Sequence, residues 1–327
     1  MKILDQLSPN SKPSFSFEII PPRRGKSAQE ILDIVEKLKP YNPSFIDVTN
    51  HSSEAVYEES EDGTIRRRVR KKRPGTISIC GIIQNRFNID TVAHLLCQGF
   101  TREETEDALI ELNYLGIQNV LAIQGDEQNF KRTVERHRTV NHYAKDLVKQ
   151  IVDLRTGKYI EELEGADPID MCIGVAGFPE KHFEAPNMKT SMRYLKQKVA
   201  AGADYIVCQM FFDNAVFYDF KKQCRDEGIQ VPIIPGIKII DRVKQLHTIP
   251  KTFHINIPDK LVDGIMENRK SVKKIGLDWC LKQCRDLLHH GENHIHFYIM
   301  NDVSRVIKVM DALFSSKKAE KPNNLQL

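Results

Sequence analysis

Residues 187–210 read NMKTSMRYLKQKVAAGADYIVCQM, and the order of patterns in this stretch decides the fold. Residues 187–201 have the amphipathic pattern of a helix. Gly202 follows them, at a position where a left-handed C-terminal cap is favoured. Residues 205–210 are then almost continuously apolar, which is typical of a parallel strand covered on both faces. The stretch therefore predicts one helix–strand unit of an α/β fold.

The same unit recurs along the 327-residue chain. Gly116 and Gly228 end helical patterns as Gly202 does, and Thr101 with Glu104 forms a capping box that begins another helix. The other predicted helices cover residues 28–38, 214–227 and 271–289. The predicted strands cover residues 15–20, 45–49, 91–97, 119–124, 171–177, 205–210, 231–237 and 294–300. Eight strands alternating with helices favour a closed (β/α)8 TIM barrel over an open doubly wound sheet.

We expect a single catalytic barrel domain over residues 1–314. An extended loop is predicted after strand two, over residues 51–75, and extra helices are predicted before strand eight, within residues 238–269. Residues 315–327 are polar and are expected to form a disordered tail.

Composition and charge exclude several classes of protein. Hydrophobic residues make up 41% and charged residues 28%, as in ordinary globular proteins, and the net charge of +4 does not indicate a nucleic-acid binder. No run of 18 apolar residues predicts a membrane span, and no apolar signal core begins the chain, so we expect a cytoplasmic protein. Seven scattered cysteines indicate reduced thiols. Cys280 and Cys284 lack the paired spacing of a structural zinc site, and we expect no metal.

Residues 66–73 form a basic run in which only Val69 is uncharged, and five acids precede it between Glu54 and Asp62. One interpretation is a nucleic-acid patch. The other is a solvated loop whose acidic and basic halves attract each other. No aromatic side chain interleaves the arginines, so we favour the second interpretation and expect no nucleic-acid partner.

Three motifs of other protein classes are absent. Gly25-Lys26-Ser27 resembles the end of a phosphate-binding P-loop, but Ile20 stands where the first glycine is required. No Gly-x-Gly-x-x-Gly follows a strand, so a dinucleotide would have to bind by other means. Gly-x-Ser-x-Gly is also missing, which argues against a hydrolase.

Polar residues at the predicted strand ends are the candidates for chemistry, because barrel enzymes carry their active sites there. Glu18 lies among apolar neighbours in strand one, where desolvation should raise its pKa toward that of a general acid. Its alternative role is an ion pair with Arg23 or Arg24. His94 is either a hydrogen-bonded core residue or a functional one, and Asp126 either faces the barrel mouth or caps a helix.

Aromatic and amide groups gather near the same expected face. Gln209 is followed by Phe211 and Phe212, which suit a flat heterocycle, although both rings could instead pack between barrel and helices. The strand ends thus offer two acids, amides and aromatic rings. These groups indicate acid-assisted chemistry on a planar, hydrogen-bonding ligand.

Eight segments of the chain resemble the methylenetetrahydrofolate reductase family, in the order the family has them. They cover the chain from about residue 15 to residue 301 and are FSFEIIPPR, VTN, HLLC, NVLAIQGD, GFPEKHFEA, KQKVAAGADYIVCQMFFDN, PIIPGI and HFYIMN. The chain resembles the bacterial form, a catalytic barrel without a regulatory domain. The resemblance implies a homo-oligomeric enzyme of one-carbon metabolism and methionine biosynthesis.

The resemblance also implies the reaction and its residues. FAD is expected on the C-terminal face of the barrel, where NADH or NADPH reduces it before methylenetetrahydrofolate takes the same place and leaves as 5-methyltetrahydrofolate. Glu18 matches the family's general acid, Asp126 an aspartate near flavin and pterin, and Gln209 an amide that contacts folate. The residues expected to hold FAD are Thr49, Asn50, His94, Gln124, Gly125, Asp126, Phe178, His182, Glu184 and Lys198.

Three residues depart from the family pattern. Gln124 stands where many relatives have an arginine, Ser191 where many have an aspartate, and Asp302 where many have an arginine that meets the folate. Arg305, one helical turn beyond Asp302, is expected to take over that contact with the substrate.

Two alternative functions stay open. A catalytically impaired barrel could bind flavin and folate as a partner or regulatory subunit. Glu18 and Asp126 are both present, which favours the enzyme, and the three departures keep this alternative open. A metal-independent lyase or aldolase would need a Schiff-base lysine at a strand end, and we expect no lysine in such a place.

Overall fold

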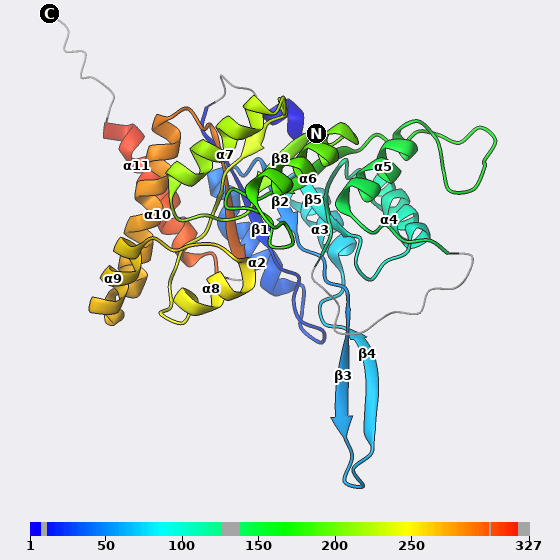
Figure 1. Ribbon diagram of the computed structural model, residues 1–327, viewed down its shortest axis with the longest axis horizontal. Coiled ribbons are helices and arrows are strands. Elements are labelled where there is room, and N and C mark those ends of the chain that lie inside the picture. The colour runs from blue at the N-terminus through cyan, green and yellow to red at the C-terminus, as the bar shows by residue number, and fades with distance from the viewer. Residues whose placement is uncertain (8–11, 126–137, 301, 320–327) are drawn as a thin grey trace, which may run out of the picture.

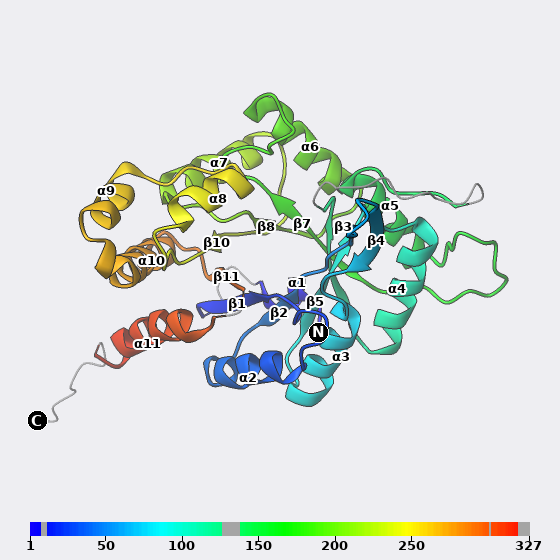
Figure 2. The same cartoon turned by 90° about the horizontal axis from the view of Figure 1, so that it is seen from below.

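The protein is a (β/α)8 barrel. A computed structural model describes residues 1–7, 12–125, 138–300 and 302–319. Parallel strands form one sheet in the order β10-β11-β1-β2-β5-β6-β7-β8-β9, and helices surround it (Figure 1 and Figure 2). Strands β9 and β10 flank Pro235 and pair with opposite neighbours, β8 and β11, so together they act as the seventh barrel strand. The predicted TIM barrel is confirmed.

All eight predicted strands are present, with ends within two residues of the prediction. They are β1 (Ser14–Ile19), β2 (Phe45–Val48), β5 (Thr91–Leu96), β6 (Asn119–Ile123), β7 (Cys172–Gly177), β8 (Tyr205–Cys208), β9 (Ile233–Ile234) with β10 (Gly236–Ile237), and β11 (His294–Met300). Because the strands are short and buried on both faces, their continuous apolar runs identify them well.

The helices around the barrel are α2 (Gln29–Leu38), α3 (Thr76–Phe87), α4 (Arg102–Tyr114), α5 (Ala144–Arg155), α6 (Met188–Ala200), α7 (Asn214–Asp226), α10 (Val272–His289) and α11 (Ser304–Ala319). The capping box of Thr101 and Glu104 begins α4 as predicted. Gly116, Gly202 and Gly228 have the positive φ angles expected after helices. Helices α3, α5 and α11 were not predicted. In α3 the isoleucines are β-branched residues typical of strands, which conceals the helix in the sequence.

Additional helices lie in the segment before the last strand and at the start of the expected tail. Residues 238–269 include α8 (Gln245–Phe253) and α9 (Asp259–Glu267), which confirms the extra helices before the last strand. Helix α11 continues to Ala319 and therefore includes the first part of the expected tail, whereas residues 320–327 lie outside the described residues.

Alternate residues of each strand face the barrel interior or the helices. In β1, Phe15 and Phe17 pack outward into the main hydrophobic core, and Ser16 and Glu18 face inward. The interior also holds a smaller apolar cluster that includes Ile3 of the short helix α1 (Ile3–Gln6). The Ile3 amide donates a hydrogen bond to Asn119 Oδ1 (2.9 Å), which fixes α1 across the N-terminal end of the barrel. Helix α1 therefore covers part of the N-terminal end of the barrel.

The insertion after β2 is an antiparallel ribbon rather than an irregular loop. Strands β3 (Ser53–Glu59) and β4 (Ile65–Lys71) pair along their length and project away from the barrel (Figure 1). Arg68 Nε lies 3.3 Å from Glu58 Oε2, and Arg70 Nε lies 3.6 Å from Glu54 Oε1. The expected attraction between the acidic and basic halves is confirmed. Charged residues on both faces of β3 and β4 leave no apolar alternation in the sequence, so these strands were not predicted.

Within the described ranges, no helix is long and apolar enough to cross a membrane. All seven cysteines are free and buried, and Cys280 and Cys284 lie on the core-facing side of α10. The same ranges contain no group of three or more His, Cys, Asp or Glu residues arranged to hold a metal ion.

Candidate active site

A cavity of about 950 Å³ opens at the C-terminal ends of β6, β7 and β8. Its floor includes Ala122, Ile123 and Ala176 from the barrel strands. Seven residues predicted to bind ligand line its walls, namely Gln124, Gly125, Phe178, His182, Glu184, Lys198 and Gln209. The barrel therefore brings together side chains that lie up to 85 positions apart in the sequence, between positions 124 and 209.

Gly125 occupies a place that only glycine fits without strain. Its φ is +87°, and a Cβ there would lie 3.4 Å from the Gln98 side chain and 3.5 Å from that of Leu96. The backbone can therefore turn sharply after β6 and leave the cavity wall open to a ligand. Asp126, the next residue, lies outside the described residues, so its expected position at the mouth stays a prediction.

The loop after β7 carries polar groups into the cavity and is held by its own hydrogen bonds. Gln124 Nε2 donates to both carboxylate oxygens of Glu184 (3.2 and 3.3 Å). The Glu184 amide donates to His182 Nδ1 (3.2 Å), and the His182 amide donates to Ser191 Oγ (2.9 Å). Ser191, which departs from the family pattern, thus anchors this loop to α6.

Lys198 reaches the cavity from α6. Its Nζ donates a hydrogen bond to the Ala176 carbonyl at the end of β7 and lies 5.7 Å from the centre of the Phe178 ring. Burial lowers the pKa of Lys198 to about 8. The side chain is therefore a fixed cation or donor beside an aromatic face, which suits an anionic or polar part of a ligand.

Several cavity residues were missed by the sequence analysis. Tyr143 and Lys145 begin α5, Arg193 lies on α6, and His254 follows α8. These residues stand on helices and loops rather than at strand ends, so the strand-end rule could not find them. They add two cations and two rings to the cavity.

Glu18 lies inside the barrel beneath the mouth, with 13% of its side chain exposed. Burial raises the pKa of its carboxyl to about 7; the nearby His94 and Lys238 oppose this shift, and Asp47 adds to it. His94 Nε2 lies 3.8 Å from Glu18 Oε2 and 3.5 Å from Asp47 Oδ2. A carboxyl with a pKa near neutrality can hold a proton and release it, as a general acid must.

The structure agrees with His94 as a hydrogen-bonded core residue, and its expected contact with FAD stays a prediction because His94 does not line the cavity. His94 is buried and hydrogen-bonded in the barrel, as a core histidine would be, and it also touches the candidate acid. Glu18 is not paired with Arg24, because the Arg24 side chain donates to the Lys71 carbonyl instead. The ion-pair alternative for Glu18 therefore finds no support from that residue.

Replacing Glu18 by glutamine is expected to stabilise the fold at alkaline pH. The folded state binds the Glu18 proton more tightly than the unfolded chain, so this contribution to stability is complete below the ordinary pKa of 4.5 and is lost as the pH rises through about 7. Above about pH 8 the glutamine variant should be more stable by up to about 3 kcal/mol, and below about pH 5 the two proteins should agree. Thermal unfolding of both proteins from acid to alkaline pH measures the difference in stability. A difference that does not change with pH would contradict the prediction.

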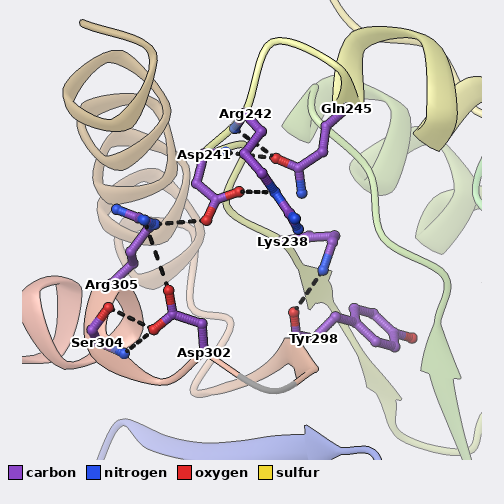
Figure 3. Close-up of polar contacts among 8 residues, drawn as sticks. All are labelled: Lys238, Asp241, Arg242, Gln245, Tyr298, Asp302, Ser304 and Arg305. Atoms are coloured by element: carbon purple, nitrogen blue, oxygen red, sulfur yellow. Dashed lines mark hydrogen bonds and ion pairs between the residues drawn. The ribbon is translucent and has the colours of Figure 1, made fainter.

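Arg305 and Lys238 occupy another side of the mouth (Figure 3). Arg305 Nε donates to Asp241 Oδ2 (2.8 Å), and Arg305 Nη2 lies 3.7 Å from Asp302 Oδ2. The guanidinium is thus already paired with two carboxylates. Lys238 Nζ donates to the Tyr298 carbonyl (3.1 Å), and burial lowers its pKa. Lys238 directly follows β10, so the expectation that no lysine stands at a strand end is wrong.

Thr49 and Asn50 follow β2 outside the lining of the cavity. The Thr49 carbonyl accepts a hydrogen bond from Thr76 Oγ1 (2.9 Å), and Asn50 Oδ1 accepts one from the His51 amide (2.9 Å). Thr49 Oγ1 is buried and has no hydrogen-bond partner in the described part of the chain. The expected contacts of Thr49 and Asn50 with FAD therefore stay a prediction.

Comparisons with known proteins agree with this architecture. The sequence model of the family described as methylenetetrahydrofolate reductase matches residues 2–313. Methylenetetrahydrofolate reductase (NADH) 1 of Arabidopsis thaliana is 30% identical over 316 residues, covering 92% of this chain and 49% of that protein. 5,10-Methylenetetrahydrofolate reductase of Escherichia coli is 27% identical over 289 residues, covering 88% of this chain and 86% of that protein.

A solved structure shares the fold. It is an uncharacterized protein from Clostridium thermocellum, described as binding two copies of 5-methyl-5,6,7,8-tetrahydrofolic acid, with a TM-score of 0.58, 14% identity and coverage of 97% of this chain and 100% of that one. The chain spans about half the length of the first curated relatives it matches. Because the family match covers nearly the whole sequence, the chain belongs to the methylenetetrahydrofolate reductase family.

Proposed function

We propose that this protein reduces 5,10-methylenetetrahydrofolate to 5-methyltetrahydrofolate, with NADH or NADPH as reductant and FAD as the carrier in a ping-pong reaction. The observation that carries the proposal is the buried Glu18 carboxyl, whose pKa of about 7 suits a general acid at the barrel mouth. Family membership supplies the substrate class.

The cavity residues fit FAD. The space of about 950 Å³ lies at the large end of the range for ligand pockets, as an extended dinucleotide needs. Lys145, Arg193 and Lys198 offer positive charge to a pyrophosphate, and Glu184 offers a carboxylate to ribose hydroxyls. The turn at Gly125 lets the backbone approach a flat ring system. When bound, FAD supplies hydride transfer to the methylene carbon of the substrate.

The protein's own residues donate the proton and stabilise the positive charge that forms on the substrate. Glu18 donates its proton to N10 of the folate, which allows the five-membered ring to open to a cationic N5-iminium. Gln209, in the cavity wall, offers an amide to the pterin. Asp126 is proposed to stabilise the cation electrostatically. Burial of Glu18 raises its pKa to about 7, so the acid can still carry a proton near neutral pH when the substrate binds.

The direct test follows the colour of the protein. Purified protein loaded with FAD should be yellow, should bleach anaerobically on addition of NADH or NADPH, and should regain its colour with methylenetetrahydrofolate. Formation of 5-methyltetrahydrofolate in the second step completes the test. A preparation that takes up no FAD, or whose reduced flavin does not react with the folate, would overturn the proposal.

Lys198→Met is expected to weaken FAD binding by about 10- to 100-fold, which corresponds to the loss of a hydrogen bond to a charged group. The matched control is Lys196→Met, because Lys196 lies on the same helix but pairs at the surface with Glu227 (3.2 Å). Titration of the protein without cofactor, followed by flavin fluorescence, gives both affinities. Equal affinities for the two variants would remove Lys198 from the FAD site.

A second candidate function is a barrel that binds flavin and folate without turnover. The observation that favours it is the pairing of Arg305 with Asp241 and Asp302, which occupies the guanidinium expected to meet the substrate. Protein that binds FAD and folate, but whose reduced flavin is not reoxidised by methylenetetrahydrofolate, would establish this alternative.

A further inference from the structure

A column of polar side chains descends from Glu18 into the barrel. Glu18 Oε2 lies 3.8 Å from His94 Nε2, and His94 Nε2 lies 3.5 Å from Asp47 Oδ2. On its other side, Asp47 Oδ2 lies 3.9 Å from His296 Nε2. These residues come from β1, β5, β2 and β11, and all face the barrel axis.

The column continues to the opposite end of the barrel through shorter contacts. His296 Nδ1 lies 2.8 Å from Ser16 Oγ, and Ser16 Oγ lies 2.9 Å from His294 Nε2. His294 Nδ1 then lies 2.7 Å from Ser14 Oγ. Ser14 is the first residue of β1 and is partly exposed, whereas Ser16 and His296 are fully buried. The polar contacts therefore run from the catalytic face to the N-terminal face.

Such a column is costly in the interior of a barrel, where bulky apolar side chains usually fill the layers. Asp47 Oδ1 and His296 Nε2 are buried and have no hydrogen-bond partner among the described residues. Each unsatisfied group of this kind costs about 1–3 kcal/mol. Buried unsatisfied groups are rare in native proteins and can mark a catalytic role.

The proposed reaction gives these buried groups such a role. NAD(P)H gives a hydride to the flavin, the reduced flavin passes it to the methylene carbon, and Glu18 gives one proton to N10 as the C–N bond breaks. Each turnover therefore consumes one proton, and it leaves Glu18 ionised. Glu18 lies below the mouth that flavin and folate would cover, so bulk water has little access to it while they are bound.

We propose that the column returns a proton to Glu18 from the N-terminal face of the barrel, an inference that rests on the proposed function. Each hydroxyl and each neutral imidazole in it carries both a donor and an acceptor. Hydrogen bonds link these groups from Ser14 to His296, so a proton that enters at Ser14 can displace one at each of them. His296 Nε2 and Asp47 Oδ2 (3.9 Å) and His94 Nε2 and Glu18 Oε2 (3.8 Å) lie beyond hydrogen-bond distance, so these side chains must approach each other for Asp47 and then His94 to pass the proton to Glu18. The path is formed by Ser14, His294, Ser16, His296, Asp47 and His94.

The charges along the path agree with this direction. Burial lowers the pKa of His294 to about 3 and that of His296 to about 4, so both rings are neutral and can exchange the nitrogen that holds the proton. Burial opposes charge on His94, yet Asp47 and Glu18 raise its pKa above the ordinary value. His94 can therefore hold the proton beside an ionised Glu18.

The other polar groups near Glu18 point elsewhere. Lys238 donates to the Tyr298 carbonyl (3.1 Å), and Tyr298 Oη donates to the Cys208 carbonyl (2.8 Å). Figure 3 shows Lys238 beside that carbonyl, apart from the ion pairs of Arg305. Among these groups of the described chain, the histidine column is the one that leads inward from the acid.

His294→Phe interrupts the column and keeps a ring where His294 stacks on Phe45 (5.2 Å between centroids, 5° between planes). Reduced, FAD-loaded enzyme is mixed with methylenetetrahydrofolate in weak buffer, with flavin absorbance and a pH-indicator dye recorded together. We expect flavin reoxidation in the first turnover to be unchanged, because Glu18 starts protonated. Proton uptake should lag behind it and be at least about tenfold slower than in the native protein.

Ser16→Ala serves as a second variant, because it removes one oxygen from the middle of the column. His290→Phe is the matched control, since His290 is exposed on the surface and should change nothing. In protein without ligands, Asp47→Asn should lower the pH at which the infrared band of the Glu18 carboxyl titrates, because Asp47 raises the pKa of Glu18. The band is assigned by its loss in Glu18→Gln.

The outcomes separate this inference from the proposed function. If native protein shows no flavin reoxidation by the folate, the proposed function fails. If reoxidation proceeds but His294→Phe and Ser16→Ala take up protons as fast as native protein, Glu18 is reprotonated through the mouth and the column is not a proton path.

Discussion

Replacing Glu18 by glutamine is expected to slow the reoxidation of reduced flavin by methylenetetrahydrofolate by about 10²- to 10⁴-fold, the usual contribution of a general acid. Glutamine has nearly the shape of the protonated side chain but cannot give a proton to the leaving nitrogen. Reduction of the flavin by NADH or NADPH needs no such proton, and it should stay within about threefold of native protein. Anaerobic stopped-flow absorbance resolves the two half-reactions.

The control for this experiment is Glu292→Gln. Glu292 is also a buried glutamate, but its carboxylate pairs with Lys221 (2.5 Å) just before β11, away from the mouth. Both half-reactions of Glu292→Gln should proceed at the rates of native protein. Normal folate turnover in Glu18→Gln would remove Glu18 from the acid role.

The pH dependence of native protein gives a further check on the same group. In the proposed mechanism the protonated form of Glu18 is the active one, and burial raises the pKa of Glu18 to about 7. Folate-dependent reoxidation should therefore be constant at acid pH and fall about tenfold per pH unit above neutrality. A rate that stays constant through pH 9 would show that another group supplies the proton.

Replacing Gly236 by alanine is expected to prevent the barrel from closing. A Cβ at this position would lie 2.1 Å from the Cys208 carbonyl oxygen and 2.6 Å from Cε2 of Tyr298. The first of these is a backbone atom of the neighbouring strand β8, so it cannot rotate away. We expect a loss of more than about 3 kcal/mol in the free energy of unfolding, the upper end of the usual cost of overpacking. Such a loss is a large share of the stability of a typical domain.

Gly264→Ala is the matched control for the backbone effect. Gly264 lies inside α9, and a Cβ there would meet its nearest neighbour, Ile275 Cγ2, at 4.0 Å. Alanine is a better helix former than glycine, so this variant should gain up to about 1 kcal/mol. Denaturant unfolding of both variants measures the contrast. A Gly236→Ala protein with native stability would show that β8 and β11 can separate without cost.

Much of the fold follows from local sequence patterns. The eight apolar runs and the glycines after the helices predicted the strand ends within two residues, because strand and helix periods are properties of short segments. Glu18 could be singled out for a similar reason, since its flanking phenylalanine and isoleucine already indicated a desolvated carboxyl. The ribbon β3–β4 was missed as a pair of strands, because charges on both faces removed the usual alternation.

Which side chains meet was decided by the closed barrel. Lys238 directly follows the predicted end of the seventh strand at Ile237, but its approach to Glu18 became visible only in the closed barrel. Asp47 and His296 were visible as inward-facing candidates only after β1 had paired with both β2 and β11. The sequence places Arg305 one turn beyond Asp302. Its ion pair with Asp241 depends on a loop 64 positions away in the chain.

The sequence by itself determined the barrel, the position of the candidate acid and the family, because each can be recognised from patterns within short segments of the chain. The tertiary structure decided the environment of that acid, since His94, Asp47 and Lys238 approach it only when four separate strands surround one axis. Distances between side chains from different strands set both the desolvation and the charges around a titratable group. Those two quantities fix its pKa, and no local pattern contains them.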